Sequence, residues 1–145
     1  MDSTLYEKDI LLWVEDTVSK LRNRDFENLD LKNLIEEIES LGISQKKELI
    51  SRLMVLLEHL LKRLYVDSFY DYNGWERTIR NQRAELDLLL SQVPSLQSRW
   101  ETSFNDAWKR ALLKVKKEYR EVFFPEAWPF EQSIEVILNE DMWEN

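Results

Sequence analysis

The sequence contains very little cysteine, glycine, proline and histidine. Among its 145 residues there are no cysteines, two glycines, three prolines and one histidine. Without cysteine the chain has no thiol nucleophile, no thiolate metal ligand and no disulfide. Two glycines disfavour the glycine-rich loops that cradle phosphates or dinucleotides, and one imidazole disfavours zinc and oxygen-activating iron sites. We therefore expect no cofactor, and these absences favour a non-enzymatic role.

Long apolar runs are also absent. No run approaches the roughly 18 residues needed to span a membrane. The first residues, Met1–Thr4, lack the basic start and apolar core of a signal peptide. We therefore expect a soluble, cytoplasmic protein that makes no membrane contact. Apolar residues nevertheless reach 43% of the chain, which indicates a globular protein rather than a disordered one.

The charge of this acidic protein is divided into three segments. The net charge is −8 over the whole chain, made up of −6 over residues 1–45, +5 over residues 46–120 and −7 over residues 121–145. Two interpretations are open. The acidic ends can fold against the basic middle by electrostatic complementarity, or the middle can carry a basic patch for an anionic partner.

Apolar residues recur every three or four positions along most of the chain, which is the period of amphipathic helices. The pattern predicts helices over residues 4–23, 31–41, 44–70, 74–91, 95–122 and 131–139. We therefore predict an all-α fold, a bundle of five main helices plus a short C-terminal helix, in one domain over residues 1–145. The leucine-rich third helix and the aromatic-rich fifth should form its centre.

Several residues have the spacing of helix caps. Thr4 and Glu7 match a capping box, and Asp30 can cap the start of the second helix. Gly42 is expected to adopt the left-handed conformation and to end that helix. The segment Asn73–Glu76 resembles another capped helix start.

Five stretches of the chain together resemble a bacterial family catalogued as domain of unknown function 29. They read LIEEIESLG (34–42), SRLMVLLEHLLK (51–62), GWERTIRNQRAEL (74–86), VPSL (93–96) and FPEAWPFEQSIEVILNEDMW (124–143). The resemblance covers nearly the whole chain and implies a small, all-helical bacterial protein. It implies no activity that can be assigned to a residue. Trp128 stands where the family pattern has a cysteine.

Three arginines and a tryptophan make one candidate binding site. Arg77, Arg80 and Arg83 follow each other at three-residue spacing, so their guanidinium groups lie along one drifting stripe of the helix. Such a stripe can bind phosphate or carboxylate groups in a bidentate manner, and Trp75 can stack on an unpaired base. The alternative is that the arginines pair with the acidic ends of the chain and that the aromatic side chains fill the core.

His59 is a second candidate. It lies beside the leucine-rich face of its helix, where a histidine is commonly half-buried with one hydrogen-bond partner. General acid–base catalysis needs a second positioned group, and Glu58 or another nearby glutamate would have to supply it. A two-metal carboxylate site needs more than one histidine, so we expect no metal and name no catalytic residue.

We therefore expect a non-enzymatic module that binds another protein, or itself, through a helix face. The alternative is a domain that binds nucleic acid or a phosphate ligand through Arg77, Arg80 and Arg83. A second alternative is an enzyme or metal site that uses His59 and nearby glutamates.

Overall fold

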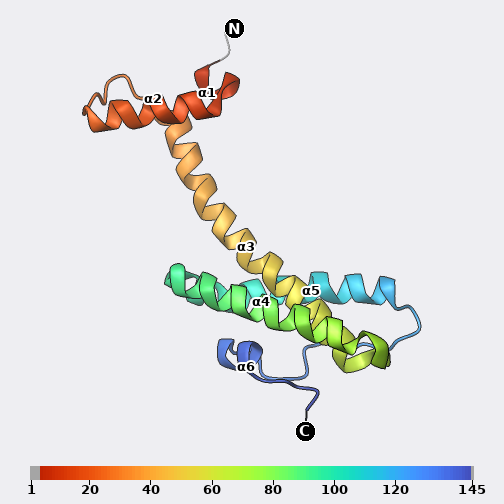
Figure 1. Ribbon diagram of the computed structural model, residues 1–145. Coiled ribbons are helices and arrows are strands. Elements are labelled where there is room, and N and C mark those ends of the chain that lie inside the picture. The colour runs from red at the N-terminus through yellow and green to blue at the C-terminus, as the bar shows by residue number, and fades with distance from the viewer. Residues whose placement is uncertain (1–3, 145) are drawn as a thin grey trace. The chain divides into compact units, whose positions relative to one another are not determined.

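Every regular element of the described chain, residues 4–144, is a helix, as a computed structural model of the protein shows (Figure 1). The elements are α1 (Leu5–Lys8), α2 (Ile10–Arg22), α3 (Leu31–Tyr65), η1 (Phe69–Asp71), α4 (Tyr72–Gln92), η2 (Pro94–Arg99), α5 (Trp100–Glu118) and α6 (Ile134–Asn139). The predicted all-α class is therefore confirmed. Within the described residues, no helix combines the length and the apolarity that crossing a bilayer requires.

The helices fall into two compact units, Met1–Ser44 and Gln45–Asn145. The N-terminal unit comprises α1, α2 and the first turns of α3. The C-terminal unit comprises the remainder of α3 and all later elements. The prediction of one domain over residues 1–145 stays a prediction.

Asp9 divides the first predicted helix, 4–23, into α1 and α2. The Thr4 hydroxyl accepts a hydrogen bond from the Glu7 amide, as the capping-box spacing predicted. Asp9 then takes an extended conformation, and its carboxylate accepts a hydrogen bond from the Leu12 amide at 3.2 Å. An aspartate that offers its carboxylate to the backbone favours such a cap over a continuous helix. The continuous helix was therefore a wrong prediction.

Asp30 starts α3, as predicted. Its carboxylate accepts hydrogen bonds from the Asn33 amide at 3.4 Å, from the Asn33 side chain at 2.7 Å and from the Trp13 indole at 3.3 Å. The hydrogen bond from the Asn33 side chain is the main reason why the pKa of Asp30 is lowered. One carboxylate thus caps α3 and holds the indole of α2.

Gly42 does not end a helix, so the prediction of two helices, 31–41 and 44–70, was wrong. α3 continues through Gly42 as one helix of 35 residues, and no glycine of the described chain has a positive φ. An internal glycine destabilises a helix by only about 0.5–1 kcal/mol relative to alanine. Good helix formers on both sides, Glu36–Leu41 and Gln45–Leu49, are sufficient to outweigh that penalty.

The core of the C-terminal unit includes the leucine-rich part of α3 and the aromatic-rich α5, the two segments that were predicted to form the centre. Its largest fully buried side chains come from the second half of α3, from α4, from α5 and from α6; they include Leu53, Leu57, Ile79, Leu86, Phe104, Val115 and Ile137. The leucines of α3 at 49, 53, 56, 57, 60 and 61 cover more than one narrow stripe and have no measurable exposure. A helix that is apolar around so much of its circumference must be surrounded by other helices.

Tryptophans attach the irregular segment 119–133 to the C-terminal unit. The Trp100 indole donates to the Gln132 carbonyl at 2.7 Å, and the Trp108 indole donates to the Glu126 carbonyl at 3.2 Å. The Trp128 ring lies 5.7 Å from the Trp108 ring and 6.0 Å from the Phe104 ring, in edge-to-face geometry. Buried indoles usually find a hydrogen-bond partner, and here two backbone carbonyls supply it.

The remaining differences lie at helix ends. α3 ends at Tyr65 rather than 70, and α4 begins at Tyr72 without a side-chain cap, so the capped start predicted at Asn73–Glu76 was wrong. The predicted helix 95–122 is a 3₁₀ helix that starts at Pro94, followed by α5, which ends at Glu118. Proline fits the first position of a helical turn because it has no amide hydrogen to satisfy.

Gly42→Ala tests the continuity of α3. A Cβ atom at Gly42 would meet no atom within 4 Å, so the substitution should raise the free energy of unfolding by about 0.5–1 kcal/mol. Urea denaturation followed by far-ultraviolet circular dichroism measures the change. Gly74→Ala is the matched control, because Gly74 is also helical with open space around it. If Gly42→Ala destabilised the protein and Gly74→Ala did not, Gly42 would have the left-handed conformation that ends a helix. That result would contradict a continuous α3.

Candidate functional site

Arg83, a predicted ligand-binding residue, is buried and holds the C-terminal segment. Its side chain is only 10% exposed. It donates to the Ile137 carbonyl at 2.9 Å, to the Asp141 carboxylate at 2.6 Å and to the Glu140 carbonyl. The two carbonyls lie at the end of α6 and just beyond it, where helix carbonyls lack amide partners. All three guanidinium nitrogens of Arg83 therefore donate hydrogen bonds within the chain.

Arg83 also shows why the stripe of three arginines is not a single site. Ile79, Arg83, Leu86 and Leu90 follow each other at four-, three- and four-residue spacing, and all four are buried. Arg83 thus lies in the apolar stripe of α4, which is the sequence signal that marks it as a structural residue. Arg77 and Arg80 are exposed, and no ion pair joins either of them to another residue within 4–144.

Trp75 packs inside the C-terminal unit. Its ring centroid lies 6.0 Å from that of Tyr72 and 6.5 Å from that of Tyr119. The side chain is half-buried and packs against the core. Trp75 therefore packs against the core and its aromatic neighbours, which agrees with the alternative in which the aromatic side chains fill the core.

Arg63 is a half-buried cation that sequence reasoning missed. Its guanidinium carbon lies 3.9 Å from the Tyr72 ring centroid and 5.2 Å from that of Trp143, and its Nε lies 3.5 Å from the Glu76 carboxylate. A guanidinium stacked on aromatic faces is stabilised by cation–π attraction. Nothing in the local sequence around Arg63 indicates these partners, because they are contributed by α4 and by the C-terminal segment.

His59 is half-buried on α3 and has one local partner. Its Nδ1 lies 2.8 Å from the Val55 carbonyl, which can only accept, so Nδ1 carries the proton. Burial, reinforced by the Lys62 cation, lowers the pKa of His59. His59 is thus half-buried with one hydrogen-bond partner, as its position beside the leucine-rich face of the helix indicated.

Glu58 is the buried carboxylate next to His59. It is 3% exposed, and its Oε1 lies 3.3 Å from the Lys114 ammonium without hydrogen-bond geometry. The adjacent position on α3 turns Glu58 toward α5 and away from His59. Among residues 4–144, no group of three or more histidine, cysteine, aspartate or glutamate side chains is arranged to hold a metal ion.

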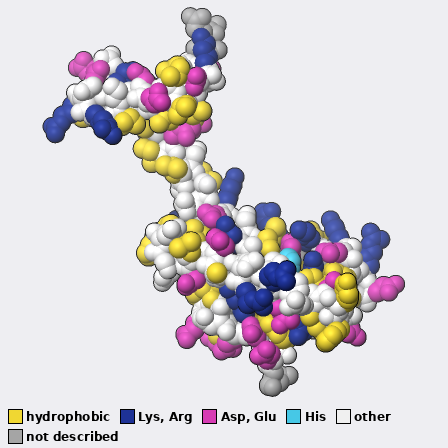
Figure 2. Space-filling view, in the orientation of Figure 1, with side chains coloured by type: hydrophobic (Ala, Val, Ile, Leu, Met, Phe, Trp, Pro, Cys, Tyr) yellow, Lys and Arg dark blue, Asp and Glu magenta, His cyan; other side chains and the backbone are white. Residues whose placement is uncertain are grey.

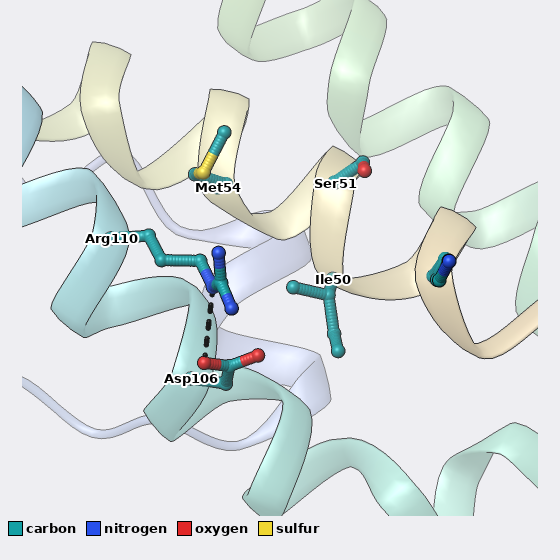
Figure 3. Close-up of a pocket in the computed structure, with 6 residues that line it drawn as sticks. Ile50, Ser51, Met54, Asp106 and Arg110 are labelled. Carbon is teal, nitrogen blue, oxygen red and sulfur yellow. Dashed lines mark hydrogen bonds and ion pairs between the residues drawn. The ribbon is translucent and has the colours of Figure 1, made fainter.

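A shallow groove with a mixed polar and apolar lining runs between α3 and α5 (Figure 3). It has a volume of about 290 Å³, and its lining includes Lys47, Ile50, Met54, Asp106 and Arg110. The guanidinium of Arg110 is paired with Asp106 at 3.2 Å, one turn earlier on α5. The groove has an apolar floor but lacks a buried polar group that could orient a ligand.

The N-terminal unit carries a second groove, which is almost entirely apolar. It lies between α2 and the first turns of α3, has a volume of about 250 Å³ and is lined by Trp13, Val14, Thr17, Val18, Leu21, Leu34, Glu37, Ile38 and Leu41. Tyr6 contacts two of the lining residues: its hydroxyl donates to Glu37, and its ring packs edge-on against Trp13. The hydrogen bond to Glu37 raises the pKa of Tyr6 to about 12.

Exposed aliphatic side chains extend this groove into a wider surface, which we call the apolar face. It consists of Ile10, Leu11, Val14, Val18 and Leu21 on α2, and Leu31, Ile35, Ile38 and Leu41 on α3. Each of the nine is 41–67% exposed, and Figure 2 shows hydrophobic side chains at the surface of α2 and of the start of α3. The sequence showed these apolar stripes, but periodicity does not distinguish a stripe that is covered from one that is exposed.

Arg83→Met and Arg80→Met form a matched pair that tests the role of Arg83. Losing Arg83 deprives two carbonyls and a carboxylate of their donor, and each hydrogen bond to a charged group is worth roughly 1.5–3 kcal/mol. Arg83→Met should therefore lower the free energy of unfolding by at least about 2 kcal/mol. The exposed Arg80→Met should change it by less than about 0.5 kcal/mol. Equal, small changes in urea denaturation would contradict a structural role for Arg83.

His59 should make stability depend on pH below neutrality. Its pKa is lower in the folded chain than the usual 6.5 of an unfolded one, so the unfolded state takes up the proton first. Above pH 6.5 the imidazole is neutral in both states, and stability should fall as the pH drops from 6.5 through the folded pKa. His59→Gln should remove this part of the dependence in thermal melts. Because the chain has one histidine, identical pH profiles for the two proteins would contradict a lowered pKa.

Comparison with known proteins identifies a family and adds no activity. A family model described as Domain of unknown function DUF29 matches residues 5–143 of the 145-residue chain. No curated protein and no solved structure matches the chain. The match extends over both units and includes the segments by which the sequence resembled this family. The chain therefore belongs to the DUF29 family.

Proposed function

We propose that this DUF29 protein is a non-enzymatic interaction module and that the apolar face of its N-terminal unit is the docking surface. The observation that most supports this proposal is the concentration of exposed apolar side chains in the N-terminal unit. Of the 19 large hydrophobic side chains that are exposed in the described chain, 13 belong to residues 5–43. Such a concentration of exposed apolar side chains is typical of a protein interaction site.

The N-terminal unit buries too little to be explained as a conventional small domain. Within residues 4–44, Trp13 is the one large hydrophobic residue that is buried. Units of about 40 residues usually need disulfides, metals or association for stability. This chain has no cysteine, so association with a further apolar surface is the remaining means of stabilisation.

The two alternatives have less support. A site for nucleic acid or phosphate would have to bind through Arg77 and Arg80 without Arg83. The Arg83 guanidinium already donates its hydrogen bonds to the C-terminal segment. Catalysis at His59 lacks a positioned second group, because Glu58 points to Lys114. Neither alternative explains the apolar face.

Site-specific photo-crosslinking tests the proposal. A benzophenone amino acid is placed at Ile38 on the apolar face, and in a control chain at Leu113 on α5; the two side chains are 59% and 57% exposed. The full-length chains are irradiated in the cells that produce them. We expect intermolecular adducts of defined mass from position 38 and not from position 113. Leu41→Glu in the same chain should abolish them, because it places a charge in the docking surface.

Two outcomes would overturn the proposal. Adducts that form equally from positions 38 and 113, or that survive Leu41→Glu, would show non-specific capture. Crosslinks from position 38 solely to residues 45–144 of the same chain would show that the apolar face is an internal surface of the folded protein.

A further inference from the structure

We propose that the apolar face is occupied by the apolar face of a second copy of this chain, so that two N-terminal units form one symmetric helical bundle. This inference rests on the function proposed above and names its partner. Each unit contributes α2 and the first turns of α3, each with an apolar stripe at helical spacing. Joining two such units gives an isologous contact, in which the same surface is used on both sides.

The area of the apolar face matches what a stable dimer requires. Nine aliphatic side chains that are 41–67% exposed present roughly 400 Å² per copy, if a fully exposed side chain presents about 60–120 Å². Since apolar atoms make up roughly 60% of an interface, the total buried by two copies is about 1,300 Å². Specific, stable interfaces bury about 1,200–2,000 Å².

The charges beside the apolar face fit a second copy better than a uniformly basic partner. Along the exposed edge of the α2 stripe, Glu15 and Arg22 are seven residues apart and lie on one side of the helix. Antiparallel pairing of two α2 helices about a two-fold axis near Val18 places Glu15 of each copy opposite Arg22 of the other. Symmetry forms this opposite-charge pair twice, whereas a basic helix would be repelled by Arg22 at that edge.

The edge of the α3 stripe also carries both signs. Lys32, Glu36 and Glu39 are exposed and follow at four- and three-residue spacing. A cation and two anions on one edge can be matched by the same edge running in the opposite direction. The acidic excess of the N-terminal unit therefore does not exclude self-association, because both edges of the interface include a base.

Sedimentation equilibrium of the full chain tests the inference directly. The chain has a mass of 17.6 kDa, and we expect a dimer of twice that mass. Leu41→Glu and Ile38→Glu should each raise the dissociation constant by at least about 100-fold, because each would bury an unpaired carboxylate twice in a symmetric interface. Leu113→Glu is the matched control and should leave the dimer intact, because Leu113 lies outside the apolar face.

Spin labelling provides a second measurement that does not depend on a disruptive charge. The chain has no cysteine, so a single Ser19→Cys variant on the exposed side of α2 carries one label, and any dipolar coupling must arise between copies. We expect such a coupling, and its loss when Leu41→Glu is added. Circular dichroism of each variant confirms that helix content is retained.

The outcomes separate this inference from the proposed function. If the chain is a monomer and position 38 still crosslinks to a different protein, the inference of a dimer is wrong, and the proposal of an interaction module still holds. A monomer with intrachain crosslinks alone would overturn both. A dimer that is insensitive to Leu41→Glu and Ile38→Glu would also overturn the inference, because its interface would lie elsewhere.

Discussion

Burial of the leucine-rich second half of α3 is the interaction on which the C-terminal unit depends. Leu49, Leu53, Leu57 and Leu61 have no measurable exposure, and α4, α5 and α6 all contribute to the core around them. Burying each such side chain contributes roughly 1.5–3 kcal/mol. The same helix behaves differently before Ser44, where four aliphatic side chains of its apolar stripe stay 48–67% exposed: Leu31, Ile35, Ile38 and Leu41. α3 thus carries one apolar stripe that builds a core and one whose side chains remain largely exposed.

The helical class, the identity of the core and several helix ends could be predicted because they depend on local pattern. Periodicity marked the buried leucines of α3, and the caps at Thr4 and Asp30 follow from side chains that satisfy nearby amides. Asp9 and Gly42 were misjudged because each residue type is compatible with two outcomes. Aspartate can lie within a helix or cap the next one, and glycine can end a helix or be tolerated inside it. Small local differences in free energy decide between such outcomes, such as the hydrogen bond from the Leu12 amide to Asp9 and the helix formers on both sides of Gly42, and residue spacing alone does not rank them.

The candidate site was less predictable because it depends on which surfaces meet. Arg83 was grouped with Arg77 and Arg80 by spacing, although its place between Ile79 and Leu86 in the buried stripe already distinguished it. Its partners near residues 137–141 are more than 50 positions away, beyond the range of any local pattern. The apolar face was visible as a stripe in the sequence, but its exposure became apparent only when the elements of the N-terminal unit were placed together.

The contact between Arg83 and the C-terminal segment has a consequence for synthesis on the ribosome. Translation produces the guanidinium long before the carbonyls of Ile137 and Glu140 and the carboxylate of Asp141 that satisfy it. Until those last residues emerge, closing the core would bury an unpaired cation, which is strongly unfavourable. The C-terminal unit is therefore expected to complete its fold only after residues 137–141 have left the ribosome. A chain interrupted before Ile137 would remain open and recognisable to cellular proteases.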